Sequence, residues 1–290
     1  MMLALSETEK RRFAYGFWRY RENEIAAATE MLSLVRENGI DHLDTADVYG
    51  GPGGFGGSER LMGAIRARAP ELFKGAVIAT KAGVEPGSPY NSSAAYLTAA
   101  CEASLLRLQI DKIDLFYVHR PDFLTHPAEL AETLDGLVAS GKVGAIGVSN
   151  FTAGQIAALA RYMKAPIAVH QLEFSAAHAD PLFDGTLDQA MERAIAVAAW
   201  SPLAGGRLGE TGAPEFSQLR ETLCQIGARN GASPIAVALA FLQRHPAPVT
   251  PILGTTTPNR LRECLTANAL SLSRTDWYAI VETCRGRKMP

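Results

Sequence analysis

The feature that most constrains the fold of this chain is a repeated alternation between short apolar runs and longer amphipathic stretches. Apolar runs of about 4–8 residues rich in β-branched and aromatic residues are typical of buried strands, and apolar residues recurring every three or four positions are typical of helices. We predict strands at 13–18, 42–46, 76–81, 114–119, 145–149, 167–171, 194–200 and 249–253. We predict helices at 24–39, 58–68, 92–108, 127–141, 152–163, 186–194 and 233–245, with further ones at 215–230, 258–267 and 274–284.

Local signals support several of these helix boundaries. Gly39 closes the first predicted helix, because glycine readily adopts the left-handed conformation that ends helices. Ser58 is expected to cap the second helix at its N-terminus. In the third helix Leu97, Cys101, Leu105 and Leu108 share one stripe, which is interpreted as core.

Strict strand–helix alternation predicts parallel strands with crossover helices on the outside. Eight such repeats in roughly 250 residues match the size of a closed (β/α)8 TIM barrel, and a doubly wound open sheet is the competing α/β architecture. No linker rich in Pro, Gly or Ser divides the chain, so residues 1–290 are predicted to form a single barrel domain.

Composition excludes several other classes. The chain carries 28 Lys+Arg against 30 Asp+Glu and has no basic run, which argues against a nucleic-acid partner. A hydrophobic content of 47% is too high for a disordered chain. The four cysteines lack CxxC or zinc spacing, and no segment reads as a secretion signal or a membrane span. We therefore expect a cytoplasmic protein with free thiols, no metal and no membrane partner; the oligomeric state is left open.

Polar residues end six of the predicted strands. In a barrel the C-terminal strand ends and the loops after them carry the chemistry. One such residue alone is more often a cap or loop anchor, but six at the mouth of one barrel favour a functional site. These residues are Asp44, Lys81, His119, Ser149 with Asn150, Gln171 and Ser201.

Asp44, Tyr49, Lys81 and His119 form the most informative group. A phenol has a pKa of about 10, and a neighbouring ammonium is expected to lower the pKa of Tyr49. A carboxylate paired with Lys81 would fix the amine and keep it charged. The group suits addition to a carbonyl: a cofactor supplies a hydride to carbon, the tyrosine supplies a proton to oxygen, and the histidine orients that oxygen.

At these residues the sequence resembles the aldo-keto reductases. The matching segments follow in family order: LDTADVYG (43–50), TK (80–81), VHRPD (118–122), GKVGAIGVSNF (141–151), AWSPLAGG (199–206) and PILGTTTPNR (251–260). GFWR (16–19), DGTLD (184–188) and the WY pair (277–278) are most similar to a bacterial branch of predicted oxidoreductases. The resemblance implies NAD(P)H-dependent reduction of an aldehyde or ketone to an alcohol, with Asp44, Tyr49, Lys81 and His119 as the catalytic tetrad and Tyr49 as the acid.

The resemblance also implies the cofactor contacts. Ser149, Asn150 and Gln171 would hold the nicotinamide carboxamide and Trp200 would stack on its ring. Trp18 and Arg19 would lie where the first loop meets cofactor and substrate. The pyrophosphate would be contacted by Ser201, Leu203, Gly205 and Arg207. Thr255 and Arg260 would face the adenosine 2′-phosphate, and Glu263 would lie near the adenine.

Three positions depart from the family pattern. His170 replaces an Asn, Gly254 stands where many members carry a Lys toward the 2′-phosphate, and Cys264 stands where an Asn or Gln commonly meets the adenine. Arg260 can still make a bidentate contact with a phosphate, so NADP is preferred and NAD stays possible. A glycine-rich insertion at 50–57 follows Tyr49, and its role is not readable from the sequence.

Two other functions compete with a reductase. A nucleotide-binding sensor could keep the fold with little turnover, although an intact Tyr49 and Lys81 argue against it. A Schiff-base aldolase could use Lys81 as the nucleophile, but pairing with Asp44 would keep that amine protonated. The substrate is expected to be a small carbonyl compound in an aromatic-lined pocket containing Trp18 and Tyr49, with Phe123 and Trp277 either lining it or packing elsewhere.

Overall fold

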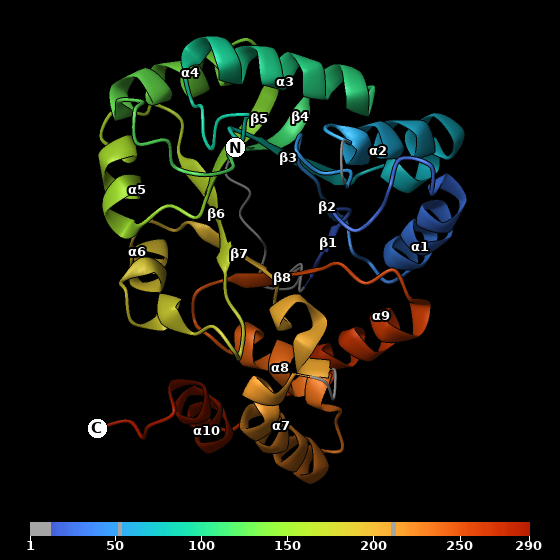
Figure 1. The fold of residues 1–290 in the computed structure, drawn as a ribbon, viewed down its shortest axis with the longest axis vertical. Helices are drawn as coiled ribbons and strands as arrows, with labels where there is room; N and C mark the ends of the chain where they lie inside the picture. Colours follow the sequence, from blue (N-terminus) through green and yellow to red (C-terminus); the bar gives the residue numbers. More distant parts are fainter. Residues whose placement is uncertain (1–12, 52–53, 210–212) are drawn as a thin grey trace. The chain divides into compact units, whose positions relative to one another are not determined.

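The computed structural model describes residues 13–51, 54–209 and 213–290 (Figure 1). Eight strands follow one another in the order β1 to β8 as a closed barrel. Consecutive strands pair in parallel from β1 to β6, and β7 pairs in parallel with β8. This confirms the (β/α)8 fold. The strands are β1 (Ala14–Gly16), β2 (His42–Asp44), β3 (Val77–Ala82), β4 (Ile113–Val118), β5 (Val143–Ser149), β6 (Ile167–Glu173), β7 (Ala196–Trp200) and β8 (Val249–Leu253).

Each predicted helix is found, with ends within a few residues of the expected ones. The helices are α1 (Ile25–Glu37), α2 (Gly57–Arg68), α3 (Ala94–Leu108), α4 (Pro127–Ala139), α5 (Ala153–Ala160), α6 (Thr186–Glu192), α7 (Ser217–Asn230), α8 (Pro234–Gln243), α9 (Pro258–Leu265) and α10 (Arg274–Arg285). The expectation for Ser58 was wrong. Gly56 caps α2 with a φ of 76°, so Ser58 lies inside the first turn. Its buried hydroxyl accepts a hydrogen bond from Thr45 at 2.8 Å instead of capping the helix.

The chain divides into two compact units, residues 1–171 and 172–290. The first unit contains β1 to β5, most of β6, and helices α1 to α5, which lie outside the strands in Figure 1. Inside its strands Ala79, Leu115 and Tyr117 form a buried cluster. Gly147 is required beside this cluster, because a Cβ there would overlap the ring of Tyr117. The interior beneath the polar strand ends is therefore filled with side chains, as the barrel architecture demands.

The second unit contains the paired strands β7 and β8 and helices α6 to α10. Trp277 of α10 stacks on Phe241 of α8, with ring centroids 5.1 Å apart, and its Nε1 donates to the Phe241 carbonyl at 3.0 Å. Trp277 is thus a packing residue, which settles the alternative left open for it.

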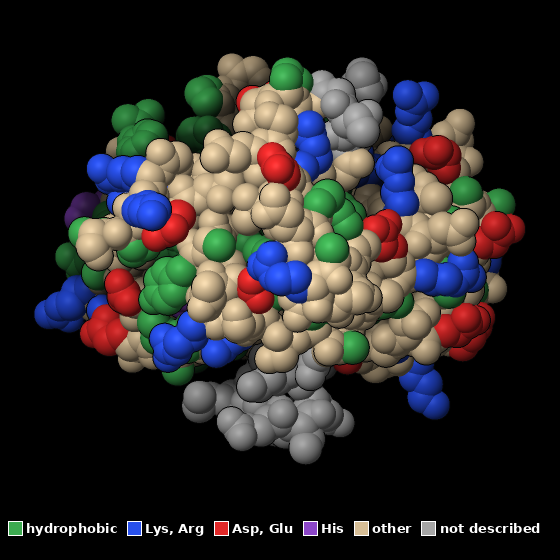
Figure 2. Space-filling model, turned by 90° about the horizontal axis from the view of Figure 1, so that it is seen from below, with side chains coloured by type: hydrophobic (Ala, Val, Ile, Leu, Met, Phe, Trp, Pro, Cys, Tyr) green, Lys and Arg blue, Asp and Glu red, His purple; other side chains and the backbone are tan. Residues whose placement is uncertain are grey.

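The surface is of mixed charge on the face drawn in Figure 2, where Lys and Arg side chains alternate with Asp and Glu. This pattern agrees with the near balance of 28 basic and 30 acidic residues. Within the described ranges, none of the helices has the length and apolar character needed to cross a membrane.

Candidate active site

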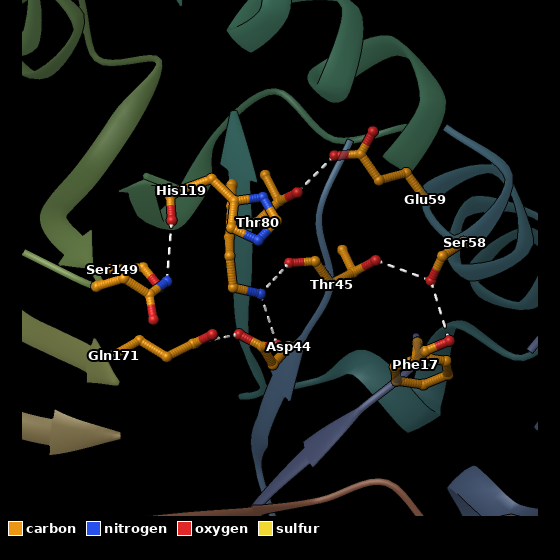
Figure 3. A network of polar contacts seen from close by, with 11 residues as sticks. Phe17, Asp44, Thr45, Ser58, Glu59, Thr80, His119, Ser149 and Gln171 are labelled. Carbon is orange, nitrogen blue, oxygen red and sulfur yellow. Dashed lines mark hydrogen bonds and ion pairs between the residues drawn. The ribbon is translucent and has the colours of Figure 1, made fainter. Parts of the chain in front are cut away.

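Lys81 lies at the centre of the site, near the end of β3, and its side chain is completely buried. Its Nζ donates to Asp44 Oδ2 at 2.7 Å and to the Thr45 carbonyl oxygen at 2.7 Å (Figure 3). The other oxygen of Asp44, Oδ1, accepts from Gln171 Nε2 at 2.8 Å. A buried charge is tolerated only when it is paired and hydrogen-bonded, and both ions meet that condition here.

The ion pair keeps the lysine charged. Burial alone would favour the neutral amine, but Asp44 and Tyr49 together outweigh it and raise the pKa of Lys81 above its usual value. A raised lysine pKa means that the pair stabilises the fold fully at neutral pH and loses that contribution only as the pH rises through the folded-state value. This agrees with the expectation that Lys81 is a cation rather than a Schiff-base nucleophile.

Tyr49 is held over the lysine by its backbone. Its N–H donates to the Ala46 carbonyl at 3.1 Å, and its carbonyl accepts from the Ser58 N–H at 3.0 Å, at the start of α2. The ring centroid lies 4.9 Å from Lys81 Nζ and 5.6 Å from the His119 ring, which it meets nearly edge to face. The structure therefore brings the four predicted tetrad side chains together.

The expected direction of the Tyr49 pKa was wrong. Lys81 does lower the pKa, as predicted, but burial is the larger effect and the net pKa of Tyr49 is raised. The charge of Asp44 acts in the same direction as burial. Tyr49 therefore carries its proton throughout the neutral range, which is the state a proton donor requires.

His119 directly follows β4, and it is a neutral imidazole at neutral pH. Burial is the main cause that holds the pKa of His119 well below its usual value, and the charges of Lys81 and Arg120 add to it. Its backbone N–H donates to the Ala82 carbonyl at 2.8 Å, which ties it to the end of β3. Its Nδ1 makes no hydrogen bond to any residue that the structure describes.

The residues expected to hold the nicotinamide amide lie beside this group, in the same unit. Ser149 ends β5, and Asn150 follows it with a φ of 59°. Asn150 Nδ2 donates to Ser149 Oγ at 2.8 Å and to the His119 carbonyl at 3.2 Å. Gln171 lies at the end of this unit in β6, and its amide already contacts Asp44. Amide and hydroxyl groups are thus gathered next to the tetrad.

The loop after β1 carries Trp18 and Arg19. The Trp18 side chain is half exposed, and the Arg19 guanidinium lies 4.7 Å from its ring centroid. After β4, Phe123 is 81% exposed, while Asp122 accepts hydrogen bonds from Ser92, Leu124 and Thr125 and holds the loop in place. Trp18 and Phe123 are therefore accessible to a ligand.

In the second unit the residues after β7 form a curved backbone. Ser201, Ala204, Gly205 and Gly206 all have positive φ, between 48° and 99°. The N–H groups of Ala204 and Gly206 close turns onto the carbonyls of Ser201 and Leu203, at 2.8 and 2.9 Å. A Cβ at Gly205 or Gly206 would meet no atom within 4 Å, so a ligand can approach the backbone closely at these two positions. Three other predicted residues lie in this segment. Trp200 ends β7, and the carbonyl of Leu203 accepts a hydrogen bond from the Gly206 N–H. The Arg207 guanidinium donates to the Glu215 carboxylate at 3.1 Å.

The loop after β8 and helix α9 carry the remaining predicted contacts. Gly254 and Thr255 follow β8 and are partly exposed, and Arg260 is exposed in the first turn of α9. Glu263 is partly exposed, whereas Cys264 is buried, and burial raises the pKa of its thiol to about 12. The N-cap residue of α9 makes no side-chain hydrogen bond to the helix end, which leaves the first-turn N–H groups available to an anion.

Sequence reasoning missed a second buried polar group. Asp47, Glu59, Thr80 and Arg107 lie behind the tetrad in the first unit, and Glu59 is fully buried in α2. The sequence feature that could have revealed this group is Glu59. It lies three residues before Met62 and four before Gly63 in an amphipathic helix, so it shares their apolar face.

Comparisons with known proteins assign the family. The Aldo/keto reductase family matches residues 12–284. A 6-dehydroglucose reductase from Novosphingobium aromaticivorans is 42% identical, covering 96% of this chain and 92% of its own length. The oxidoreductase YdhF from Escherichia coli is 32% identical, covering 96% and 95%. The crystal structure of the thermostable aldo-keto reductase Tm1743 with the inhibitor epalrestat has a TM-score of 0.81 at 24% identity, covering 94% of each chain, which is evidence for the fold. The chain belongs to the aldo/keto reductase family and is an NAD(P)-dependent oxidoreductase.

Proposed function

We propose that this protein reduces an aldehyde to an alcohol with NADPH, and that Tyr49 is the proton donor. The observation that carries the proposal is the Lys81 ammonium, which is fully buried, paired with Asp44 and placed 4.9 Å from the centre of the Tyr49 ring. A cation in this position stabilises the phenolate that forms as the proton leaves, and it costs no rearrangement during the reaction.

Each residue of the tetrad has a separate task. The nicotinamide, when bound, supplies a hydride to the carbonyl carbon. The neutral His119 orients the carbonyl oxygen by a hydrogen bond from its ring N–H. Tyr49 gives its phenolic proton to the same oxygen, so carbon gains a hydride, oxygen gains a proton, and the phenolate is reprotonated from solvent. Asp44 and the Thr45 carbonyl hold the Lys81 ammonium beside that phenolate.

Cofactor binding is proposed for the residues that each unit presents. Ser149, Asn150 and Gln171 have the amide and hydroxyl groups that a nicotinamide carboxamide requires, and Trp200 has an aromatic face for its ring. The turn from Ser201 to Gly206, whose glycines leave open space around the backbone, is proposed to face the pyrophosphate. Fluorescence quenching of the native protein on titration with NADPH measures this binding directly.

Arg260 is proposed to read the 2′-phosphate of NADPH. Arg260→Ala should weaken NADPH binding by about ten-fold or more and leave NADH binding nearly unchanged, because a charge-assisted phosphate contact is worth about 1.5–3 kcal/mol. The dissociation constants of both cofactors are measured by fluorescence titration. Arg262→Ala, two residues further along α9, is the matched control, since the Arg262 guanidinium donates a hydrogen bond to Asn259 at 3.1 Å. An equal loss for both cofactors would show that Arg260 does not discriminate between them.

The substrate class is proposed from the relative at 42% identity, which is named for the reduction of 6-dehydroglucose. We propose that this chain likewise accepts a polyhydroxylated aldehyde, such as a hexose oxidised to the aldehyde at carbon 6. The half-exposed Trp18 offers an aromatic face to a sugar, and Arg19, whose guanidinium lies 4.7 Å from the centre of that ring, offers hydrogen-bond donors. Arg120 directly follows His119, and its charge acts on His119 and Tyr49.

A substrate panel tests this class. NADPH consumption is followed with 6-dehydroglucose, with 4-nitrobenzaldehyde as an apolar aldehyde, and with glucose as the sugar that lacks a free aldehyde at carbon 6. We expect kcat/KM to be highest for 6-dehydroglucose. A preference for 4-nitrobenzaldehyde by ten-fold or more, about 1.4 kcal/mol, would replace the sugar with an apolar substrate, and no consumption with any aldehyde would favour a nucleotide-binding sensor.

A further inference from the structure

A buried network of charged side chains lies behind the Lys81–Tyr49 pair and has no task in the proposed reduction. Glu59 of α2 accepts from Thr80 Oγ1 at 2.5 Å and from Arg107 Nε at 2.6 Å. Its side chain is fully buried, and that of Arg107 is 17% exposed. Thr80 directly precedes Lys81 in β3, so the network is fixed to the strand that carries the lysine.

Asp47 connects this network with the catalytic loop. It lies between Asp44 and Tyr49 in the sequence, and its side chain is completely buried. Its N–H donates to the Lys81 carbonyl at 3.0 Å, and its own carbonyl accepts from the Gly56 N–H at 2.5 Å. The backbone of Asp47 is therefore held on both sides and its side chain has little freedom to turn toward water.

Among the described residues, the carboxyl group of Asp47 has no cation and no side chain as a hydrogen-bond partner. Within the described residues neither oxygen has a hydrogen bond of normal geometry, and the polar group directed toward it is the backbone N–H of Val48. The charged and titratable groups that face it are Glu59 from α2, Arg107 and Tyr96 from α3, and Lys81 from β3.

The local charge balance explains what state this carboxyl adopts. Asp44 is paired with Lys81 and Glu59 with Arg107, so two cations already match two carboxylates. An ionised Asp47 would be a third buried carboxylate with no cation of its own, which is a costly arrangement. Burial first, and the charge of Glu59 second, raise the pKa of Asp47 to about 8, against the opposing effects of Arg107, the Val48 N–H and Lys81.

We propose that Asp47 is a positioning residue for the proton transfer: it is a neutral carboxylic acid in the folded protein, and its ionisation puts a negative charge beside Lys81 that makes Tyr49 a weaker acid. A negative charge there stabilises the ammonium and disfavours the phenolate. The second half of the inference rests on the proposed function, since it concerns the proton that Tyr49 donates. Alkaline conditions should therefore slow reduction before Tyr49 itself ionises.

Thermal stability tests the buried acid without any turnover. An unfolded aspartate releases its proton near pH 4, whereas folded Asp47 keeps its proton up to about pH 8. The folded wild type therefore loses stability relative to the unfolded chain as the pH rises between these values, and the penalty is constant above them. Asp47→Asn carries no such penalty. We expect the melting temperature of Asp47→Asn minus that of wild type to grow by several degrees from about pH 5 to about pH 8 and then level off.

Asp276→Asn is the matched control for this measurement. The Asp276 carboxylate accepts hydrogen bonds from Arg229 at 2.6 Å and from the Ser273 hydroxyl at 2.9 Å. The Arg229 hydrogen bond is the main cause that lowers the pKa of Asp276, so its variant should give a difference that does not grow over the same range. If the difference in melting temperature between Asp47→Asn and wild type were also independent of pH, the proposal that folded Asp47 is a protonated acid would be overturned. If Asp47→Asn fails to fold, the infrared carbonyl band of a protonated carboxylic acid is followed in the wild type, and its absence at about pH 6 would overturn it equally.

Two readouts test the coupling to Tyr49. The kcat for aldehyde reduction should fall a few-fold across about pH 8 in the wild type and stay level in Asp47→Asn, because one buried charge alters the ionisation of a neighbour by about one pH unit. Superimposable profiles would overturn the positioning role.

The ultraviolet absorbance of the Tyr49 phenolate gives the same answer without turnover. It is taken as the spectrum of each protein minus that of its Tyr49→Phe form. Ionisation of Tyr49 should begin at lower pH in Asp47→Asn than in wild type, and an equal onset in both would overturn the positioning role. If no aldehyde is reduced at all, the proposed function fails, while the stability and absorbance measurements still decide this inference.

Discussion

Tyr49→Phe is expected to lower kcat for aldehyde reduction by about 10²–10⁴-fold, because a positioned proton donor contributes that much to the rate. The substitution removes the phenolic oxygen and keeps the ring that meets His119 edge to face. The fold and the affinity for NADPH should therefore change little. Burial raises the pKa of Tyr49, so the wild-type rate should stay level through neutral pH and fall only on the alkaline side.

The measurement is NADPH consumption under saturating conditions, with cofactor affinity from fluorescence titration. Tyr162→Phe is the matched control, because that ring is half exposed near the end of α5 and packs on His126. Its rate should equal that of the wild type. Equal rates for Tyr49→Phe and wild type would mean that another group supplies the proton.

Lys81→Met is the second large expectation, and it acts on both stability and rate. The change removes a fully buried cation and leaves Asp44 as an uncompensated buried charge. Breaking one half of a buried ion pair costs about 3–5 kcal/mol of unfolding free energy. Without the ammonium the pKa of Tyr49 should rise further, so kcat should also fall by orders of magnitude.

The double variant Asp44→Asn/Lys81→Met separates the two effects. Replacing both ions by neutral groups removes the unpaired charge, so denaturant titration should show that much of the lost stability returns. The rate should stay low, because no cation faces Tyr49. Recovery of both stability and rate in the double variant would show that Lys81 acts only in folding.

The arrangement of the fold was readable from the sequence because the strands are buried on both faces and the helices are amphipathic. Strands such as 114–119 and 249–253 are short apolar runs, and the structure places them at Ile113–Val118 and Val249–Leu253. The start of α2 was misjudged, because a glycine with positive φ took the capping position that Ser58 would ordinarily fill. A serine hydroxyl used in a buried contact cannot be told from a capping one by sequence alone.

The tetrad was readable from the strand ends, since parallel strands bring their C-terminal residues to one end of the barrel. The net pKa of Tyr49 was not readable, because it depends on burial in three dimensions, which here outweighs the nearby ammonium. The Glu59–Arg107 ion pair could not be predicted from the sequence either. It joins α2 to α3 across 48 residues of sequence, and nothing local in either helix identifies its partner.

Transfer of deuterium from NADPH that carries deuterium at both C4 positions of the nicotinamide tests the central claim most directly. The protein is incubated with the labelled cofactor and 6-dehydroglucose, and the product is analysed by mass spectrometry and NMR. Reduction at this site predicts one deuterium on the new alcohol carbon for each NADPH consumed, and none in the Tyr49→Phe variant over the same time. Product without deuterium at that carbon, or labelled cofactor left unconsumed, would contradict it.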